Sequence, residues 1–355
     1  MAVAWIGNRA VTLEEAGQEA VRLLNASKCP VITLNTDLHG ARVAVALAER
    51  IGAAIDLADA GTMREALLIA DKGAMSIAPG ETRRRADVLI IVGALPASYD
   101  QFVAELADSK ADLSGADHRQ LFVIAGKAAA FGKRNQSAVA LSTKGGPAAT
   151  LAAVRAQLGG RQVQATVSNF GKFAEALNAA RFPVFLYSSF GCDPLAMEML
   201  QGLVADINRK SRASTLHFPA SEAGWGAALA ATWMTGFPGR LTFARGRPEF
   251  DAWRFDVRRM LVEGEADLHL QVGGKAGPDP TEGVATRIVF AQTARPPTGA
   301  AVTITTQPAG AVVYSARLGT FEAVGSEAEG NSGATAASVL RLIGERCKPE
   351  GPLPC

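Results

Sequence analysis

Residues 86–93 read ADVLIIVG, and this stretch decides the fold class of the chain. The uninterrupted apolar run Val88–Val92 fits a strand covered on both faces, since a strand with one solvated face alternates apolar and polar side chains. Helical spacing at residues 41–52 indicates that helices separate such runs. These patterns predict a doubly wound α/β fold with parallel sheets. Further apolar runs of strand length occur at residues 29–35, 53–58, 121–126, 137–142, 182–188, 266–273 and 287–292.

Two pairs of segments within the chain are similar to each other. LNASKCPV at residues 24–31 matches LNAARFPV at 177–184, an offset of 153 residues. RRADVLIIVG at residues 84–93 matches GEADLHLQVG at 264–273, an offset of 180 residues. Such internal duplication indicates two related α/β units.

Length and composition agree with two domains and exclude several classes of protein. The 355 residues suit about two domains of roughly 150 residues each. A net charge of +2 gives no electrostatic case for binding nucleic acid or an anionic membrane surface. No run of 18 apolar residues suggests a membrane span, and the N-terminus lacks the pattern of a signal peptide, so we expect a cytoplasmic protein. No C-x-x-C motif supports a zinc ribbon or a cysteine-ligated cluster.

Segments rich in glycine and proline are the predicted connections between helices and strands. KGGPAAT at 144–150, GKAGPDPTEG at 274–283 and AQTARPPTGAAVT at 291–303 are expected to be loops. A last helix over 333–346 is expected to lead into an exposed tail that ends at residue 355.

Cys192 is the candidate nucleophile of the chain. It follows a predicted strand and precedes a predicted helix, for which Asp193 is a suitable N-cap and Pro194 a suitable first residue. A helix N-terminus lowers the pKa of a thiol, so a reactive thiolate is one interpretation. Packing at the entry of the helix is the interpretation we favour, because no histidine lies within 20 residues.

Other polar residues give weaker signals. His39 and His217 follow strands, but no metal-binding spacing connects them, so structural roles are favoured over metal ligation. His269 alternates within a strand and is expected to be packed or hydrogen-bonded, whereas His118 is expected at the surface. Gly273 ends a predicted strand, and a strand-end turn is the interpretation we favour. The alternative is that the missing side chain lets the backbone approach a phosphate. The acidic segment 325–331 suits a solvated turn better than a cation site.

The aromatic segment at residues 224–250 is the most distinctive part of the sequence. Trp225, Trp233 and Phe237 are interleaved with small residues, and Arg245 follows them. Tryptophan and arginine dominate the binding energy of many interfaces, so these residues are candidate contacts to a partner. An ordinary core role fits the composition equally well, and both interpretations stay open.

The order of segments resembles the catalytic B-type chains of formylmethanofuran dehydrogenases, which belong to the molybdopterin oxidoreductase superfamily. The resemblance runs over nearly the whole chain, and its more specific pieces are TGFP with FARG at 235–246 and EAEG at 327–330. It implies two Rossmann-like units of the molybdopterin oxidoreductase type, without the iron–sulfur segment that opens those proteins. Residues 1–72 would join 213–334 in one unit, 73–212 would form the inserted second unit, and 335–355 would form the C-terminal helix end and tail.

The residues that hold the cofactor in that family are replaced in this sequence. The loop that carries a cysteine or selenocysteine metal ligand there is occupied here by Thr62 and Met63, and a hydroxyl and a thioether cannot replace a charged thiolate. The resemblance therefore implies a vestigial cofactor cleft, with no catalytic, cofactor-binding or metal-binding residues. Three other segments are replaced in the same way. Pro219 and Ala220 stand in the family's active-site segment, and Ala94–Ala97 stand at the strand end that binds the pterin. Ala125, Gly126 and Lys127 stand at the strand end that binds the guanine dinucleotide.

Such loss resembles the β subunits of bacterial formyltransferase/hydrolase complexes. That resemblance implies a structural subunit without enzymatic activity of its own and without a cofactor. The complex transfers a formyl group from formyl-tetrahydromethanopterin to a methanofuran analogue and releases formate. The implied partners are a metal-dependent hydrolase-like α subunit, a γ subunit and a formyltransferase subunit. The alternatives are a cofactor-bearing dehydrogenase subunit, or a binder of the polyglutamate tail of the methanofuran analogue through Lys127, Lys133 and Arg134.

Overall fold

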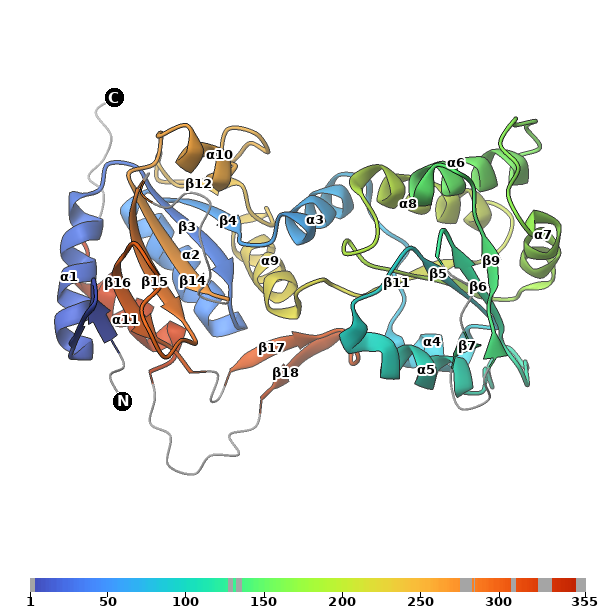
Figure 1. Ribbon diagram of the computed structural model, residues 1–355, viewed down its shortest axis with the longest axis horizontal. Coiled ribbons are helices and arrows are strands. Elements are labelled where there is room, and N and C mark those ends of the chain that lie inside the picture. The colour runs from blue at the N-terminus through green and yellow to red at the C-terminus, as the bar shows by residue number, and fades with distance from the viewer. Residues whose placement is uncertain are drawn as a thin grey trace. The chain divides into compact units, whose positions relative to one another are not determined.

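A computed structural model describes residues 4–126, 130–131, 136–274, 283, 285–307, 311–324 and 334–348 (Figure 1). The chain forms two compact units. The first unit comprises residues 1–66, 221–314 and 321–355, and the second comprises 67–220 and 315–320. The boundaries thus fall elsewhere than at the predicted 72/73 and 212/213. In addition, residues 315–320 belong to the second unit, and the last helix belongs to the first.

The first unit is built on a nine-stranded sheet. Its five central strands, in the order β4-β3-β14-β15-β16, are parallel, and antiparallel strands flank them on both sides. The direction of winding reverses between β3 and β14, which is where open α/β sheets usually bind ligands. The strands are β1 (Ala4–Ile6), β2 (Arg9–Val11), β3 (Pro30–Asn35), β4 (Ala54–Leu57), β12 (Leu241–Thr242), β13 (Glu249–Phe250), β14 (Leu268–Gly273), β15 (Thr286–Ala291) and β16 (Ala300–Thr305).

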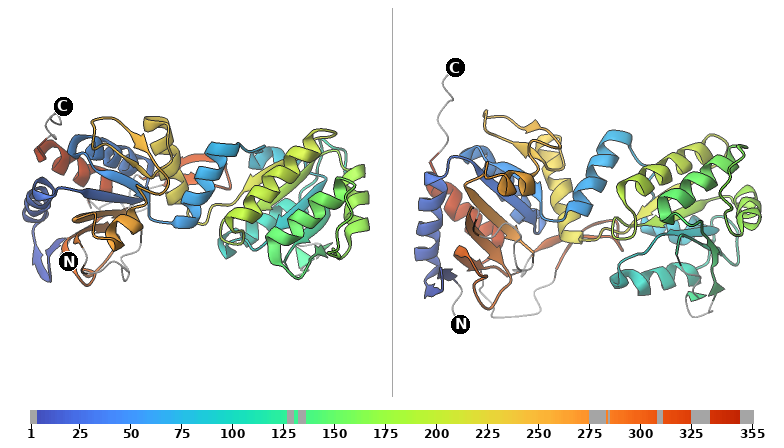
Figure 2. Two further views of the ribbon diagram at one scale, coloured as in Figure 1. Left: turned by 90° about the horizontal axis from the view of Figure 1, so that it is seen from above. Right: turned by 45° about the horizontal axis from the view of Figure 1, so that its top comes forward.

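Helices of the first unit pack next to one another in the order α1, α11, α2 and α9 (Figure 2). Both α1 and α2 begin at side-chain caps, and α2 ends at Gly52 in the left-handed conformation with φ 66°. The short helix α10 packs on Val31 of β3 and Ala54 of β4. The helices are α1 (Leu13–Ala26), α2 (Leu38–Ile51), α9 (Glu222–Thr235), α10 (Val257–Val262) and α11 (Ala336–Arg346), with α3 (Ala60–Lys72) crossing from this unit into the second.

The second unit has a five-stranded, wholly parallel sheet in the order β11-β10-β5-β6-β9. Alternate residues of its central strands pack into one apolar core with α6, α7 and α8, and α4 and α5 lie on the other side of the sheet (Figure 1). Its winding reverses between β5 and β10. The elements are α4 (Pro79–Arg85), β5 (Val88–Val92), η1 (Ala97–Tyr99), α5 (Asp100–Asp108), β6 (Gln120–Ile124), β7 (Ala130–Phe131), β8 (Gln136–Ser137), β9 (Val139–Leu141), α6 (Gly146–Leu158), α7 (Phe170–Ala179), β10 (Pro183–Tyr187), α8 (Pro194–Asn208) and β11 (Ser214–His217). The strands β17 (Val312–Ser315) and β18 (Thr320–Ala323) pair with each other.

The sequence duplication corresponds to a repeated structural element at the reversal point of each sheet. Strands β3 and β14 pair in the first unit, and β10 and β5 pair in the second. Asp267 accepts hydrogen bonds at 2.7 and 3.1 Å from the two N–H groups that precede Pro30. Asp87 accepts the equivalent bonds at 2.6 and 2.9 Å before Pro183. In each unit an aspartate therefore fixes the register of the two parallel strands that meet there.

The predicted α/β class with parallel sheets is confirmed, and the predicted strands lie within about a residue or two of observed ones. Two loop predictions are wrong in part. Residues 144–150 contain the start of α6 at Gly146, where Pro147 suits the first turn, and residues 291–303 run into β16 at Ala300. The predicted loop 274–283 lies almost wholly outside the described residues. Across the described ranges, every helix is too short or too polar to cross a bilayer.

Candidate functional site

The loop at Thr62 and Met63 is the start of a helix buried in the first unit. Both the N–H and the hydroxyl of Thr62 donate to one carboxylate oxygen of Asp59, each at 2.6 Å. Met63 is completely inaccessible to solvent. A Cβ atom added at Gly239 would lie only 2.7 Å from the Met63 sulfur, so the thioether packs directly on that backbone. The position at which the sequence resemblance placed a lost metal ligand is thus part of the packed core in this structure.

Charged groups beside this helix start are paired with one another. Asp56, at the carboxyl end of β4, is 5 % exposed and accepts N–H groups of Leu57 and Val257 at 2.8 and 3.3 Å. Burial raises the pKa of Asp56 to about 7, and the positive charge of Arg240 opposes that rise. Arg240 lies 3.6 Å from Asp56 and 2.7 Å from Asp256, with its own backbone in the left-handed region at φ 50°. This cluster neutralises itself and leaves no charge directed at a ligand.

The reversal point between β3 and β14 is closed by the chain itself. Asp37 caps α2 by accepting the N–H groups of His39 and Gly40 at 2.9 and 3.1 Å, so a carboxylate already occupies the end where a phosphate would bind. A Cβ added at Gly273 would lie 2.1 Å from the carbonyl oxygen of Asn35. Gly273, with φ 80°, is therefore a strand-end turn against neighbouring backbone, as the favoured interpretation predicted.

The equivalent point of the second unit is closed in the same way. A Cβ added at Gly93 would lie 2.4 Å from the carbonyl oxygen of Gly191, and one added at Gly191 would lie 2.1 Å from that of Ala94. Cys192 is buried, and its thiol donates to the Val92 carbonyl at 3.5 Å. These contacts agree with the packing interpretation of Cys192.

Ala125 and Gly126 line a small cavity of about 240 Å³ at the carboxyl ends of β5 and β6. Apart from Asp100, its side chains are apolar or absent, so it offers no set of polar groups to grip a dinucleotide. Pro219 is buried in the same unit, where its carbonyl accepts the Tyr99 hydroxyl at 3.0 Å, and Ala220 is exposed. The described side chains at these positions supply neither a charged metal ligand nor a polar grip on a pterin, so they do not fit a molybdopterin.

The structure also describes the four histidines that the sequence analysis considered. His269 is buried, with its Nε2 2.9 Å from the Thr33 hydroxyl, and His118 is exposed, as predicted. His39 lies exposed on the first turn of α2, and the ring of His217 packs against that of Tyr187 at a centroid distance of 5.4 Å, tilted by 35°. The described chain contains no cluster of three or more His, Cys, Asp and Glu side chains that could hold a metal. Lys127, Lys133 and Arg134, and the acidic segment 325–331, lie outside the described residues.

The aromatic segment is partly core and partly surface. Trp233 is 64 % exposed and packs at 5.4 Å on Phe321, and Arg245 is exposed beside Glu249 at 3.5 Å. Trp225 and Phe237 are half-buried, and Phe237 stacks on a neighbouring ring of β13 at 5.1 Å. The segment therefore presents large apolar rings to solvent, which is uncommon unless a surface is used for binding.

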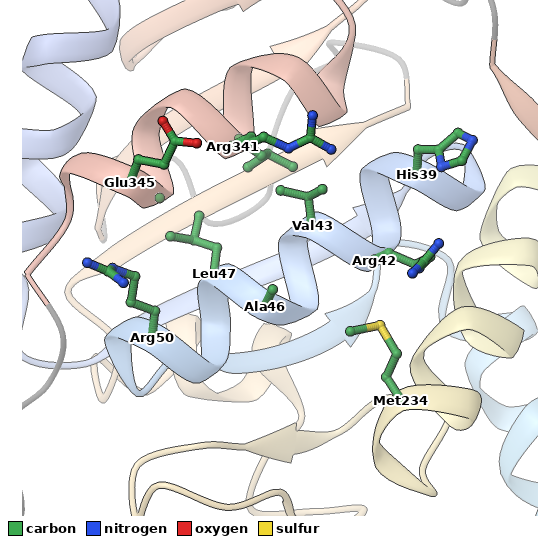
Figure 3. A pocket seen from close by; sticks show the side chains of 11 residues that line it. His39, Arg42, Val43, Ala46, Leu47, Arg50, Met234, Arg341 and Glu345 are labelled. Atoms are coloured by element: carbon green, nitrogen blue, oxygen red, sulfur yellow. The ribbon is translucent and has the colours of Figure 1, made fainter.

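Sequence reasoning missed a basic groove on the first unit, shown in Figure 3. It has a volume of about 520 Å³ and lies between α2 and α11 beside Met234 of α9. Arg42 and Arg50 line it from α2, and Arg341 from α11. The spacing of Arg42, Ala46 and Arg50 at four-residue intervals on a predicted helix was the available signal, because such residues share a helix face.

The fold and these sites define an α/β protein in which backbone contacts close both reversal points of the sheets, while apolar and basic side chains are exposed on the first unit, as in a component of an assembly. No family model matches the chain. It is 34% identical over 283 residues to the FhcB protein of the formyltransferase/hydrolase complex of Methylorubrum extorquens, covering 78% of this chain and 76% of that protein. The crystal structure of FhcABCD from Methylorubrum extorquens in complex with methylofuran contains a similar chain. That match has a TM-score of 0.83 and 31% identity, over 97% of this chain and 98% of that one.

The chain belongs to the FhcB family of formyltransferase/hydrolase complexes. The resemblance to this family predicted from the sequence is thereby confirmed.

Proposed function

We propose that the chain is a non-catalytic, structural component of a formyltransferase/hydrolase complex. Its similarity to FhcB and to a chain of the FhcABCD crystal structure supports this role. In this proposal the complex transfers formyl from formyl-tetrahydromethanopterin to a methanofuran analogue and releases formate during one-carbon oxidation. Formyl transfer and hydrolysis lie on the partner subunits, which are a hydrolase-like α subunit, a γ subunit and a formyltransferase subunit.

The burial of Met63 is the observation that carries the non-catalytic part of the proposal. A fully buried thioether packed on Gly239 supports the view that this fold was inherited from molybdopterin oxidoreductases and has lost the metal centre. A soft, neutral thioether is also a poor ligand for a high-valent molybdenum or tungsten ion. In this view both units are of the molybdopterin oxidoreductase type, and their remaining task is to hold partner subunits.

We assign partner binding to the aromatic segment of the first unit. Trp233 is the principal anchor, because it is 64 % exposed and its ring is already held against Phe321. Preorganised aromatic side chains bind with little loss of conformational entropy. Phe237, Trp225 and Arg245 would surround that anchor.

Analysis of the intact complex tests this proposal. The chain is tagged, the complex is purified under gentle conditions, and molybdenum, tungsten and pterin are quantified per copy of the chain. We expect amounts far below stoichiometric, together with co-purification of the partner subunits. Stoichiometric molybdenum, tungsten or molybdopterin would overturn the proposal, as would a chain that purifies alone.

A variant separates a structural from a catalytic role of the old ligand loop. Thr62→Val keeps the shape of the buried side chain and removes the hydroxyl that bonds to Asp59. Turnover per assembled complex is expected to stay at the wild-type level, even where less complex assembles. A large loss of turnover at unchanged assembly would show that this loop takes part in the chemistry.

A further inference from the structure

The basic groove of the first unit has an apolar floor. Leu47 of α2 and Leu340 of α11 are fully buried and line its base, together with the half-buried Val43 of α2. Figure 3 labels Leu47 and Val43. Ala46 is exposed along the groove, and Met234 is 45 % exposed at its edge. A concave apolar strip with a flexible methionine at its rim is suited to receiving apolar side chains from another molecule.

Positive charge surrounds this floor. Arg42, Arg50 and Arg341 are all exposed around the groove, with Glu345 as the one carboxylate among the lining residues. Within the described part of the chain, neither Arg42 nor Arg341 forms an ion pair. Arg50 donates its Nε–H to the Cys347 carbonyl at 2.8 Å, which fixes the side chain and leaves its terminal amino groups facing outward. The rim is therefore complementary to carboxylates.

Gly344 keeps the groove open. It lies in the last turn of α11, two residues before the helix ends at Arg346. Packing does not require it there, because an added Cβ would meet only Leu47, at an ordinary contact distance of 3.8 Å. A larger residue at this position would stabilise the helix and fill the groove. The absence of a side chain at Gly344 therefore leaves this part of the groove open.

We propose that this groove binds an acidic amphipathic helix contributed by another subunit of the complex. The proposal rests on the proposed function, which supplies the partner subunits. Apolar side chains of that helix would lie on the floor, and its carboxylates would pair with the arginines. Arg42 and Arg50 are eight residues apart on α2, which corresponds to about 12 Å along the helix axis. Carboxylates eight residues apart on the bound helix match that distance.

Two kinds of variant test the groove in the full-length chain. Gly344→Leu fills it, and Arg42→Glu combined with Arg50→Glu reverses its charge. Arg258→Glu is the control for reversing one charge elsewhere, since Arg258 is exposed on α10, away from the groove lining. Affinity for the other subunits is measured by titration against the immobilised chain, and thermal melting checks that each variant is folded.

We expect each groove variant to bind the partner subunits at least about tenfold more weakly, because one variant blocks the apolar contact and the other repels the carboxylates. The control is expected to bind as wild type. Gly344→Leu is expected to melt no lower than wild type. Wild-type affinity of both groove variants would overturn this proposal and leave the proposed function intact. A wild-type chain that binds no partner subunit would overturn both.

Cross-linking identifies the occupant. A photoreactive amino acid replaces Ala46, and the reconstituted complex is irradiated and digested. The expected cross-linked peptide comes from another subunit and carries glutamate or aspartate beside an apolar helical stripe. Cross-links to a second copy of this chain or to a basic segment, or no cross-link in the assembled complex, would contradict the proposal.

Discussion

Shortening Met63 measures how much the packing of this buried side chain stabilises the fold. Met63→Ala removes a side chain with no solvent exposure, and one wall of the resulting cavity is the backbone at Gly239, which cannot collapse into it. Substitutions of this kind lower the free energy of unfolding by about 2–5 kcal/mol. We expect a loss of about 3 kcal/mol, which is a large share of the stability of a typical domain.

A second substitution tests the same contact from the other side. Gly239→Ala places a Cβ atom 2.7 Å from the Met63 sulfur and 3.5 Å from a carboxylate oxygen of Asp56. The forced displacement is expected to cost about 1–3 kcal/mol, as for other overpacked cores. In the double variant the new methyl group enters the space that Met63 leaves. The combined loss is therefore expected to be at least about 1 kcal/mol smaller than the sum of the two single losses.

Urea unfolding of the four full-length proteins, followed by circular dichroism, gives the free energies for this cycle. Met75→Ala is the control, because Met75 is 54 % exposed and its loss is expected to change stability by no more than about 0.5 kcal/mol. The reasoning fails if Met63→Ala is as harmless as the control. It also fails if the two substitutions at the contact are simply additive.

Two further predictions concern charged groups. Burial raises the pKa of Asp56 from 3.8 to about 7, so folding takes up a proton between these values, and the stabilising contribution present below about pH 4 is lost as the pH rises through 7. The stability of wild type minus that of Asp56→Asn should therefore fall by about 4 kcal/mol from pH 4 to pH 8 in urea titrations, and a constant difference would contradict the buried-carboxyl assignment. Asp267→Ala and Asp87→Ala each remove two hydrogen bonds to backbone N–H groups, and each substitution should lower the free energy of unfolding by about 1–3 kcal/mol. An unchanged melting temperature in both variants would contradict the view that these aspartates fix the register of the paired strands.

Local sequence patterns were sufficient for the eight predicted strands, since a strand that is buried on both faces has a continuous apolar run such as Val88–Val92. They did not predict the short antiparallel strands that flank the parallel strands of the first unit. They failed where two signals compete. Gly145 and Pro147 predict a loop, yet α6 begins between them at Gly146, because proline is as suitable for the first turn of a helix as for a loop. The duplicated segments likewise predicted two units but not their boundaries, which depend on contacts between distant parts of the chain.

The sequence by itself determined the α/β class, the resemblance to a family and the absence of a thiolate at positions 62 and 63, because each of these depends only on which side chains are present. Only the tertiary structure decided what surrounds these two positions. The burial of Met63 against Gly239, 176 positions later in the chain, cannot be read from either residue alone. The basic groove depends in the same way on α2 and α11 packing together, which brings Arg341 opposite Arg42 and Arg50. Which side chain stands at a position can be read from the sequence, whereas the proximity of residues that are distant in the chain arises only when the chain folds.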